Sequence, residues 1–230
     1  MFPLYSTQEA LFANITILTK TTINLASKEV GECIENVLGP LGTPTKIEKK
    51  GTVVCVGGGI GVAPMHPIAQ AYKAAGNRVI SIIGARNKDL LIMEEEINKC
   101  SDEVIICTDD GSYGRKDLVT VPLKELCEEG IPDEVVAIGP PIMMKFVSET
   151  TRPYKVHTMV SLNTIMVDGT GMCGGCRVTV GDETKFVCVD GPEFDGHLVD
   201  FDNMMLRQKS YKTQEEHATH KCRIGLHGEK

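Results

Sequence analysis

In the middle of the chain, short continuous apolar runs alternate with stretches whose apolar residues recur at helical spacing. The runs TVVCV (52–56) and VISIIG (79–84) are typical of strands that are buried on both faces. The stretch KDLLIMEEEINKC (88–100) carries apolar residues at helical spacing, which predicts a helix. Five such strands alternate with helices, and the last strand is KVHTMVSLN (155–163). We therefore expect an α/β domain over 49–162, with a parallel sheet and helices on both faces.

The loops that follow these strands all fall on one edge of the predicted sheet, where parallel α/β sheets bind their ligands. The first loop is rich in glycine, so its backbone N–H groups can approach a pyrophosphate, and a helix begins directly after it. A tight strand–helix turn without a ligand is the alternative for this loop. The candidate nucleotide-binding residues on the loops are Gly57, Gly58, Gly59, Gly61, Ala63, Pro64, Arg86, Asp109, Asp110, Gly139, Pro140 and Met143.

For some of these residues the sequence predicts a specific position, and for others it leaves two roles open. The first strand is expected to end at Val56, and Pro64 fits the first turn of the following helix, where its missing donor costs nothing. The two aspartates after the third strand are candidates to hydrogen-bond a ribose. Arg86 either pairs with a phosphate or anchors its loop at a helix start. Met143 lies at helical spacing and suits the core as well as a site.

A glycine-rich stretch, DGTGMCGGC (168–176), carries the second type of candidate chemistry. Cys173, Cys176 and Cys188 follow a C-x2-C-x11-C spacing, and soft thiolates on such a loop suit zinc or an iron–sulfur cluster. Asp168 extends the pattern to D-x4-C-x2-C-x11-C, which reads as a plant-type [2Fe–2S] site with a carboxylate in the first place. A hairpin is expected to return Cys188 to the loop. Structural zinc and three buried cysteines that pack as small apolar side chains remain the alternatives.

The two ends of the chain have weaker patterns. Residues 1–48 contain strand-like alternation and Gly-Pro turns, which indicates an irregular β-rich module. Residues 163–230 are expected to form the metal-binding segment and a polar tail that is partly helical.

Composition narrows the class of protein. The net charge of −7 and the pI near 5.4 leave no electrostatic footprint for nucleic acid or an anionic membrane. Nine cysteines, most of them without framework spacing, indicate reduced thiols and not a disulfide scaffold. No apolar run reaches membrane-spanning length, and no secretory signal pattern opens the chain. We therefore expect a cytoplasmic protein.

The ordered motifs GGGIGVAP, GARNKDLL, TDDGSYGRK, IGPPIMMKFV and CVDGPEFDGH, together with the cysteine loop, resemble the ferredoxin–NADP reductase superfamily. More narrowly, the chain is similar to electron-transfer subunits that combine FAD, a nicotinamide site and a C-terminal [2Fe–2S] cluster. These are the small subunits of NADH-dependent ferredoxin:NADP oxidoreductases (sulfide dehydrogenases) and, further off, the electron-transfer subunit of dihydroorotate dehydrogenase. Asp168 in place of a cysteine is typical of the former.

The resemblance implies a set of cofactors and partners. The metal ligands would be Asp168, Cys173, Cys176 and Cys188, and NAD(H) or NADP(H) would bind the sheet edge. The FAD-binding candidates are Pro3, Leu4, Thr21 and Thr22, within FPLYST and ILTKTTINL, which resemble the family's flavin motifs. Relatives begin with a complete FAD-binding β-barrel, so residues 1–48 would be a partial barrel, either because the chain is truncated or because FAD binding is weakened. The implied partners are a larger iron–sulfur flavoprotein of the glutamate-synthase small-subunit type and ferredoxin.

Electron transfer through these cofactors requires no general acid or nucleophile. The sequence shows no Ser/His or Cys/His constellation, so no catalytic side chain is predicted. Flavin would convert between the two-electron chemistry of a nicotinamide and the one-electron chemistry of the cluster. The alternative is a non-catalytic nucleotide- and metal-binding remnant with a scaffolding or regulatory role.

Overall fold

The computed structural model describes residues 2–3, 25–34 and 36–211. The chain divides into two compact units, one of residues 42–205 and one of residues 1–41 with 206–230. In the unit of residues 1–41 and 206–230, the described strand β1 (Phe2–Pro3) pairs antiparallel with β2 (Cys33–Ile34). The three domains expected from the sequence, with bounds at 48 and 162, stay predictions.

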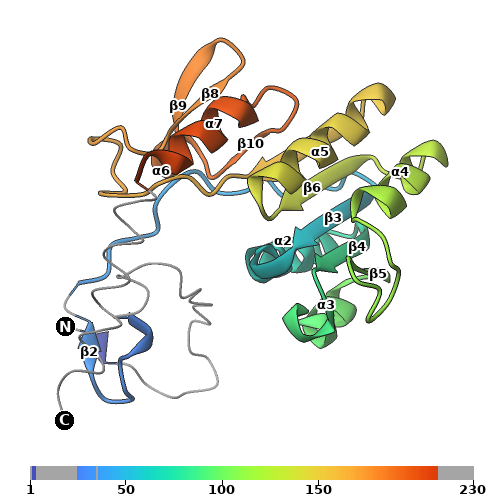
Figure 1. Cartoon of the computed structure of the whole chain (residues 1–230), viewed down its shortest axis with the longest axis horizontal. Coiled ribbons are helices and arrows are strands. Elements are labelled where there is room, and N and C mark those ends of the chain that lie inside the picture. Colours follow the sequence, from blue (N-terminus) through green and yellow to red (C-terminus); the bar gives the residue numbers. More distant parts are fainter. Residues whose placement is uncertain (1, 4–24, 35, 212–230) are drawn as a thin grey trace. The chain divides into compact units, whose positions relative to one another are not determined.

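Residues 42–205 contain the remaining strands and almost all of the helices (Figure 1). The strands are β3 (Thr52–Gly58), β4 (Arg78–Ala85), β5 (Glu103–Thr108), β6 (Glu134–Ile138), β7 (His157–Ser161), β8 (Arg177–Val180), β9 (Glu183–Phe186) and β10 (Glu193–Asp195). The α-helices are α2 (Val62–Ala74), α3 (Glu94–Cys100), α4 (Thr120–Glu128), α5 (Pro141–Thr151), α6 (Val187–Asp190) and α7 (Phe201–Gln208). The 3-10 helices are η1 (Gly59–Gly61), η2 (Lys88–Leu90), η3 (Arg152–Tyr154) and η4 (Lys209–Tyr211).

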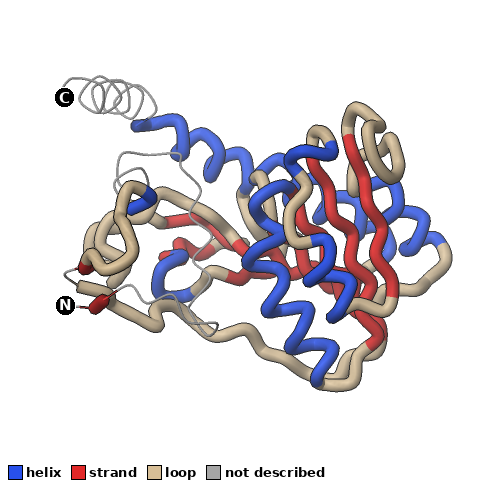
Figure 2. Tube along the Cα trace, turned by 90° about the horizontal axis from the view of Figure 1, so that it is seen from below, coloured by secondary structure: helices blue, strands red, loops and turns tan. Residues whose placement is uncertain are grey.

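A six-stranded sheet in the order β10-β7-β6-β3-β4-β5 forms the centre of this unit (Figure 2). Every pairing among β3 to β7 is parallel, which confirms the expected α/β fold. The strand β10 was not expected; it pairs antiparallel with β7, with Phe194 opposite Val160. It therefore joins the segment that carries the cysteines to the edge of the sheet.

Alternate residues of the strands supply two hydrophobic cores, one on each face. On one face, Val54 and Val56 pack with Leu123 of α4 and Met144 of α5. On the other face, Val53 and residues of neighbouring strands pack with α2 and α3. All of these strand positions are fully buried, because helices cover both faces of a parallel sheet. The continuous apolar runs in the sequence follow from this burial.

The helix after β4 is shorter than the sequence predicts. It begins only at Glu94, because Met93 has a left-handed backbone (φ 57°) and the residues before it run as η2 and an extended connection. Leu91, Ile92 and Met93 pack against the second core from this connection. Their apolar character thus reflects burial of a loop and not one face of a longer helix.

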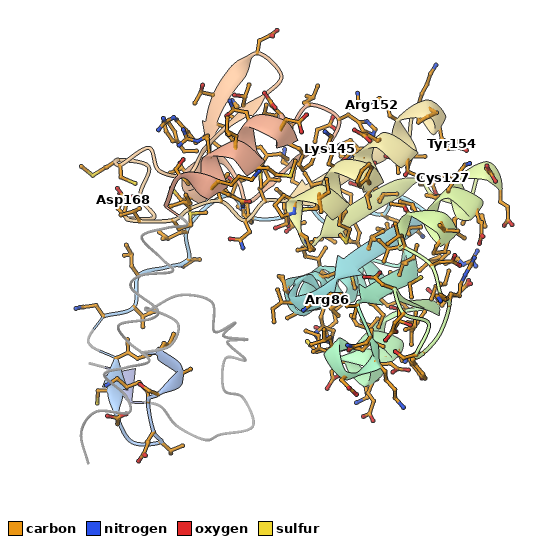
Figure 3. The ribbon with its side chains drawn as sticks, in the orientation of Figure 1. Arg86, Cys127, Lys145, Arg152, Tyr154 and Asp168 are labelled. Atoms are coloured by element: carbon orange, nitrogen blue, oxygen red, sulfur yellow. The ribbon has the colours of Figure 1, made fainter. Side chains whose placement is uncertain are left out.

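Residues 163–205, which we call the cysteine segment, are attached to α5 along one face of that helix. Lys145 Nζ lies 2.8 Å from Asp202 Oδ1, and the Arg152 guanidinium donates to the carbonyl of His197 at 2.8 Å (Figure 3). From the same helix, Met144 and Val147 share one hydrophobic core with buried residues of the cysteine segment. The cysteine segment and the sheet are therefore packed as one body within residues 42–205.

Residues 42–50 hold the cysteine segment and the sheet from a second direction. Thr43 N–H donates to the Gly191 carbonyl at 2.7 Å, and Thr43 Oγ1 donates to the Val189 carbonyl at 3.1 Å. Thr45 Oγ1 donates to Glu193 at 2.7 Å.

No helix in the described part of the chain is long and apolar enough to cross a membrane.

Asn77, which is 4 % exposed, connects this segment to the end of α2. Its Oδ1 atom accepts from Lys50 N–H at 2.6 Å and from Gly51 N–H at 3.1 Å. Its Nδ2 atom donates to the carbonyls of Glu48 and Tyr72 at 3.0 and 2.9 Å. Both acceptor lone pairs of Oδ1 and both N–H donors of Nδ2 are thereby filled.

We expect Asn77→Ala to lower the free energy of unfolding by about 3 kcal/mol, because four backbone groups lose their buried partner. Asn98→Ala is the matched control, since Asn98 is exposed on α3 and makes one local bond to the Glu94 carbonyl. It should change stability by less than about 0.5 kcal/mol. Urea denaturation measures both, and equal effects would contradict this role of Asn77.

His197 is a titratable side chain in the contact between the cysteine segment and α5. Its Nε2 atom lies 3.0 Å from Thr151 Oγ1, and burial lowers its pKa. Asp195 opposes this shift, while Arg152 and His157 add to it. Below about pH 6.5, the usual pKa of histidine, the unfolded chain therefore binds a proton that the folded chain does not yet bind.

We expect stability to fall as the pH drops from about 6.5 to the lower pKa of the folded state. His197→Gln should flatten this part of the stability curve, because glutamine does not titrate. Thermal unfolding of both proteins between about pH 5 and 8 measures the difference, and identical slopes would rule out His197 as the cause.

Candidate functional site

The turn after β3 is the most enclosed part of the first candidate site. The strand continues through Gly57 and Gly58 and does not end at Val56 as expected, because its parallel pairing with β4 reaches Gly84. The turn itself is η1, from Gly59 to Gly61, and α2 follows it directly. Ala63 and Pro64 lie in the first turn of α2, and Pro64 is exposed.

This turn touches the end of β6 through bare backbone. A Cβ atom on Gly61 would collide with the Ile138 carbonyl oxygen and would lie 2.8 Å from Gly139 Cα. A Cβ atom on Gly58 would lie 3.1 Å from Pro140 Cδ, and one on Gly139 would lie 2.7 Å from Met143 Cε. The glycines predicted from two separate loops are therefore neighbours, and side chains larger than glycine do not fit where they meet.

The loops after β4 and β5 form the other half of this edge. Asp109 N–H and Asp110 N–H donate to the carbonyls of Ala85 and Arg86, so the two loops run side by side. Asp110 Oδ1 accepts from Ser112 N–H at 2.9 Å, and hydrogen bonds from Ser112 lower the pKa of Asp110. Arg86, Asp109 and Asp110 are all exposed (Figure 3 labels Arg86). We call the loops after β3, β4, β5 and β6 together the carboxyl edge.

Three residues at the carboxyl edge were not among those predicted. Lys88 N–H donates to Ser112 Oγ at 2.8 Å, and Lys88 Nζ lies 5.3 Å from the centre of the Tyr113 ring. The Asp-Gly-Ser sequence of the second loop is a turn signal that could have identified Ser112. The contact between Lys88 and Tyr113 joins two loops and leaves no local pattern in the sequence.

The second candidate site lies in the cysteine segment, which the expected hairpin organises. β8 and β9 pair with Arg177 opposite Phe186, and Val187 N–H donates to the Cys176 carbonyl at 3.3 Å. The hairpin returns Cys188 to Cys176 as predicted, although Cys188 lies in the short helix α6 and not in a strand. Both cysteines are buried, at 2 % and 8 % exposure, and their Sγ atoms are 3.2 Å apart.

The Cys176–Cys188 contact is a pair of free thiols. Its Sγ–Sγ distance exceeds the roughly 2.05 Å of a disulfide. Burial raises the pKa of Cys188, and the neighbouring Cys176 adds to the shift. Two buried thiols in contact cannot both ionise at low cost unless a cation compensates their charge.

Asp168 and Cys173 form a second pair on the exposed loop before the hairpin. Asp168 Oδ1 accepts from Thr170 N–H and Oδ2 accepts from Cys173 N–H, both at 2.8 Å. These backbone hydrogen bonds lower the pKa of Asp168 and keep its carboxylate ionised. Cys173 is exposed, and Gly175 N–H donates to its Sγ atom at 3.4 Å.

The four predicted metal ligands therefore occur as two pairs. Within residues 2–3, 25–34 and 36–211, no group of three or more histidine, cysteine or acidic side chains is arranged to hold one metal ion. Of the flavin candidates, Pro3 lies in β1, while Leu4, Thr21 and Thr22 lie outside the described residues.

Comparisons with known proteins identify the relatives of this chain. Residues 163–200 match the family model described as the iron-sulfur cluster binding domain of dihydroorotate dehydrogenase B. A homologue of the electron transfer subunit of dihydroorotate dehydrogenase B (NAD(+)) from Thermotoga maritima is 50 % identical over 210 residues, which is 91 % of this chain and 74 % of the relative. The probable electron transfer subunit from Methanopyrus kandleri is 38 % identical over 180 residues, 78 % of this chain and 67 % of the relative.

A solved structure of an NADH-dependent reduced ferredoxin-NADP oxidoreductase superposes with a TM-score of 0.83 at 47 % identity, covering 90 % of this chain and 75 % of that one. The resemblance inferred from the sequence motifs is thereby confirmed. The chain belongs to the family of dihydroorotate dehydrogenase B electron transfer subunits and their homologues.

Proposed function

We propose that this chain is an electron-transfer subunit that binds a [2Fe–2S] cluster through Asp168, Cys173, Cys176 and Cys188. The observation that carries the proposal is the arrangement of these four side chains in two pairs on one loop and hairpin. In a [2Fe–2S] cluster, each iron is held by two bridging sulfides and two protein ligands. A structural zinc ion requires four ligands around one point, which is a poorer match to two separate pairs.

The four side chains suit a cationic metal group by their chemistry as well as by their number. Cys176 and Cys188 are buried thiols that need positive charge to ionise, and Asp168 is already an ionised carboxylate. The Gly175 N–H group donates to Cys173 Sγ, and N–H···S bonds of this kind tune the reduction potential of iron–sulfur sites. The hydrogen bond from Gly175 N–H to Cys173 Sγ also helps to fix the conformation of the loop before the hairpin.

We further propose that a nicotinamide nucleotide binds at the carboxyl edge and FAD at the N-terminal segment. The glycines of η1 and the N-terminus of α2 suit a pyrophosphate, and the exposed Arg86, Asp109 and Asp110 are candidates to bind the ribose or a phosphate at the adenosine end of the nucleotide. When bound, the nucleotide would supply hydride chemistry, the flavin would supply conversion between two-electron and one-electron transfer, and the cluster would supply one-electron transfer. The protein's own residues bind and orient these groups.

The exposed side of the cysteine segment is the proposed exit for electrons. Cys173 is exposed, and its neighbours Met172 and Val167 are 89 % and 75 % exposed. Apolar side chains at that exposure are typical of a surface that docks another protein. Since the relatives are named as electron transfer subunits, we propose a larger catalytic subunit as the partner. An iron–sulfur flavoprotein of the glutamate-synthase small-subunit type and ferredoxin are its specific candidates.

An anaerobic visible spectrum, with iron, zinc and flavin assayed on the same sample, tests the function. We expect iron at about two atoms per chain, together with flavin absorption. Iron without flavin would remove FAD from the proposal and leave the cluster. Zinc, or no metal, would favour a non-catalytic remnant and overturn the proposal.

Cys173→Ala should abolish bound iron and the visible absorption of the cluster, because one iron loses a ligand. The thiol is exposed, so the sheet should keep its cooperative unfolding transition. Cys127→Ala is the matched control, since Cys127 lies buried on α4 (labelled in Figure 3) and outside the cysteine segment. The control should retain iron and colour; if Cys173→Ala retains them too, the ligand assignment is wrong.

A further inference from the structure

Cys188, one of the four proposed metal ligands, lies in a helix of a single turn. α6 spans only Val187–Asp190, and at its start Phe186 N–H donates to Asp190 Oδ2 at 2.6 Å. One turn of helix has too few internal hydrogen bonds to be stable by itself. The position of the Cys188 thiol therefore depends on the contacts that hold the two ends of α6.

The two ends of α6 are held by different parts of the chain. The hairpin holds the start, through the hydrogen bond to the Cys176 carbonyl. The last carbonyl groups of a helix have no partner within it, and here Thr43 supplies two donors. The Thr43 hydroxyl donates to the Val189 carbonyl at 3.1 Å, and the Thr43 N–H group donates to the Gly191 carbonyl at 2.7 Å. The first of these carbonyls belongs to the residue directly after Cys188.

The backbone beside Thr43 fits closely against the end of α6. Gly42 has a left-handed backbone (φ 80°), and a Cβ atom on it would lie 2.5 Å from the Gly191 carbonyl oxygen. A side chain at position 42 would therefore push the two segments apart. On the other side of Thr43, Thr45 Oγ1 is bonded to Glu193 at 2.7 Å. The segment is thus fixed on both sides of Thr43, which holds its two donors against α6.

Thr43 also lies where the chain enters the unit that contains the cysteines. This unit begins at Gly42, and residues 1–41 belong to the other unit. Part of the restraint on α6 therefore comes from the segment that connects the two units, and the rest comes from the hairpin next to the cysteines.

We propose that Thr43 is a positioning residue for Cys188 and that it thereby determines how firmly the metal group is retained. The inference rests on the proposed function, because it names the residue that supports one of the proposed ligands. Hydrogen bonds behind a ligand fix its orientation, and their loss typically lowers metal affinity by about tenfold or more. Thr43 acts through the backbone of α6.

The rate at which the anaerobically purified full chain loses iron to EDTA, followed by visible absorption, tests this role. We expect Thr43→Val to speed the loss by about tenfold, because valine cannot donate to the Val189 carbonyl. Thr43 is exposed, so valine requires no new space in a core. Thr43→Ser keeps the hydroxyl and should retain the original rate. Thr150→Val is the matched control, since Thr150 donates to the Phe146 carbonyl at 2.8 Å on α5, and it should leave the rate unchanged.

Alkylation of the metal-free protein with iodoacetamide, followed by peptide mass spectrometry, measures the positioning of the thiol without the metal. Thr43→Val should raise the labelling rate of Cys188 by about fivefold, which is the loss of one ordinary hydrogen bond expressed as easier local opening. The labelling rate of Cys127, which is buried on α4, should stay the same.

The two measurements separate a positioning role from a general loss of stability. Equal increases in labelling at Cys188 and Cys127 would show general destabilisation and overturn the proposal. Unchanged labelling of Cys188, or an unchanged rate of iron loss, would also overturn it. If the unchanged protein holds no iron while Thr43→Val still speeds labelling of Cys188, the proposed metal site fails and the positioning of the thiol by Thr43 stands.

Discussion

The close backbone contact between the turn after β3 and the end of β6 is the constraint on which the carboxyl edge depends. No side chain fits at Gly61, because a Cβ atom there would meet the Ile138 carbonyl. The contact is held by the parallel pairing of β3 with β6, which continues to Gly57 opposite Ile138. The shape of the edge therefore follows from the packing of the sheet, and the loops have little freedom to change it.

The same packing extends to the cysteine segment through α5. This helix begins at the carboxyl edge and contributes Met144 and Val147 to a core that also contains Cys176 and Cys188. Polar contacts at Lys145, Thr151 and Arg152 repeat along the face that meets the cysteine segment. The buried Cys176–Cys188 pair thus packs in the same hydrophobic core as one face of the sheet, which limits how far the proposed cluster can move relative to the proposed nucleotide site.

Most of the fold could be predicted because its signals are local. Burial on both faces gives β3 and β4 their continuous apolar runs, and a short hairpin between Arg177 and Phe186 follows from alternation and an intervening Gly-Asp turn. Where the prediction was wrong, a tertiary contact outweighed the local pattern. Leu91 and Ile92 look helical but cover the second core from an extended connection, and β10 forms only because β7 offers an unpaired edge.

Local patterns in the sequence identified the loops that follow the strands and the D-x4-C-x2-C-x11-C spacing, since both depend on near neighbours in the chain. Which of these residues meet is known only from the fold. The fold brings Gly58 and Gly139 together beside Met143, divides the four predicted ligands into two pairs, and places Thr43 against Val189 across 146 residues of sequence. Contacts between residues so far apart leave no periodicity to read, because each is set by how whole elements pack.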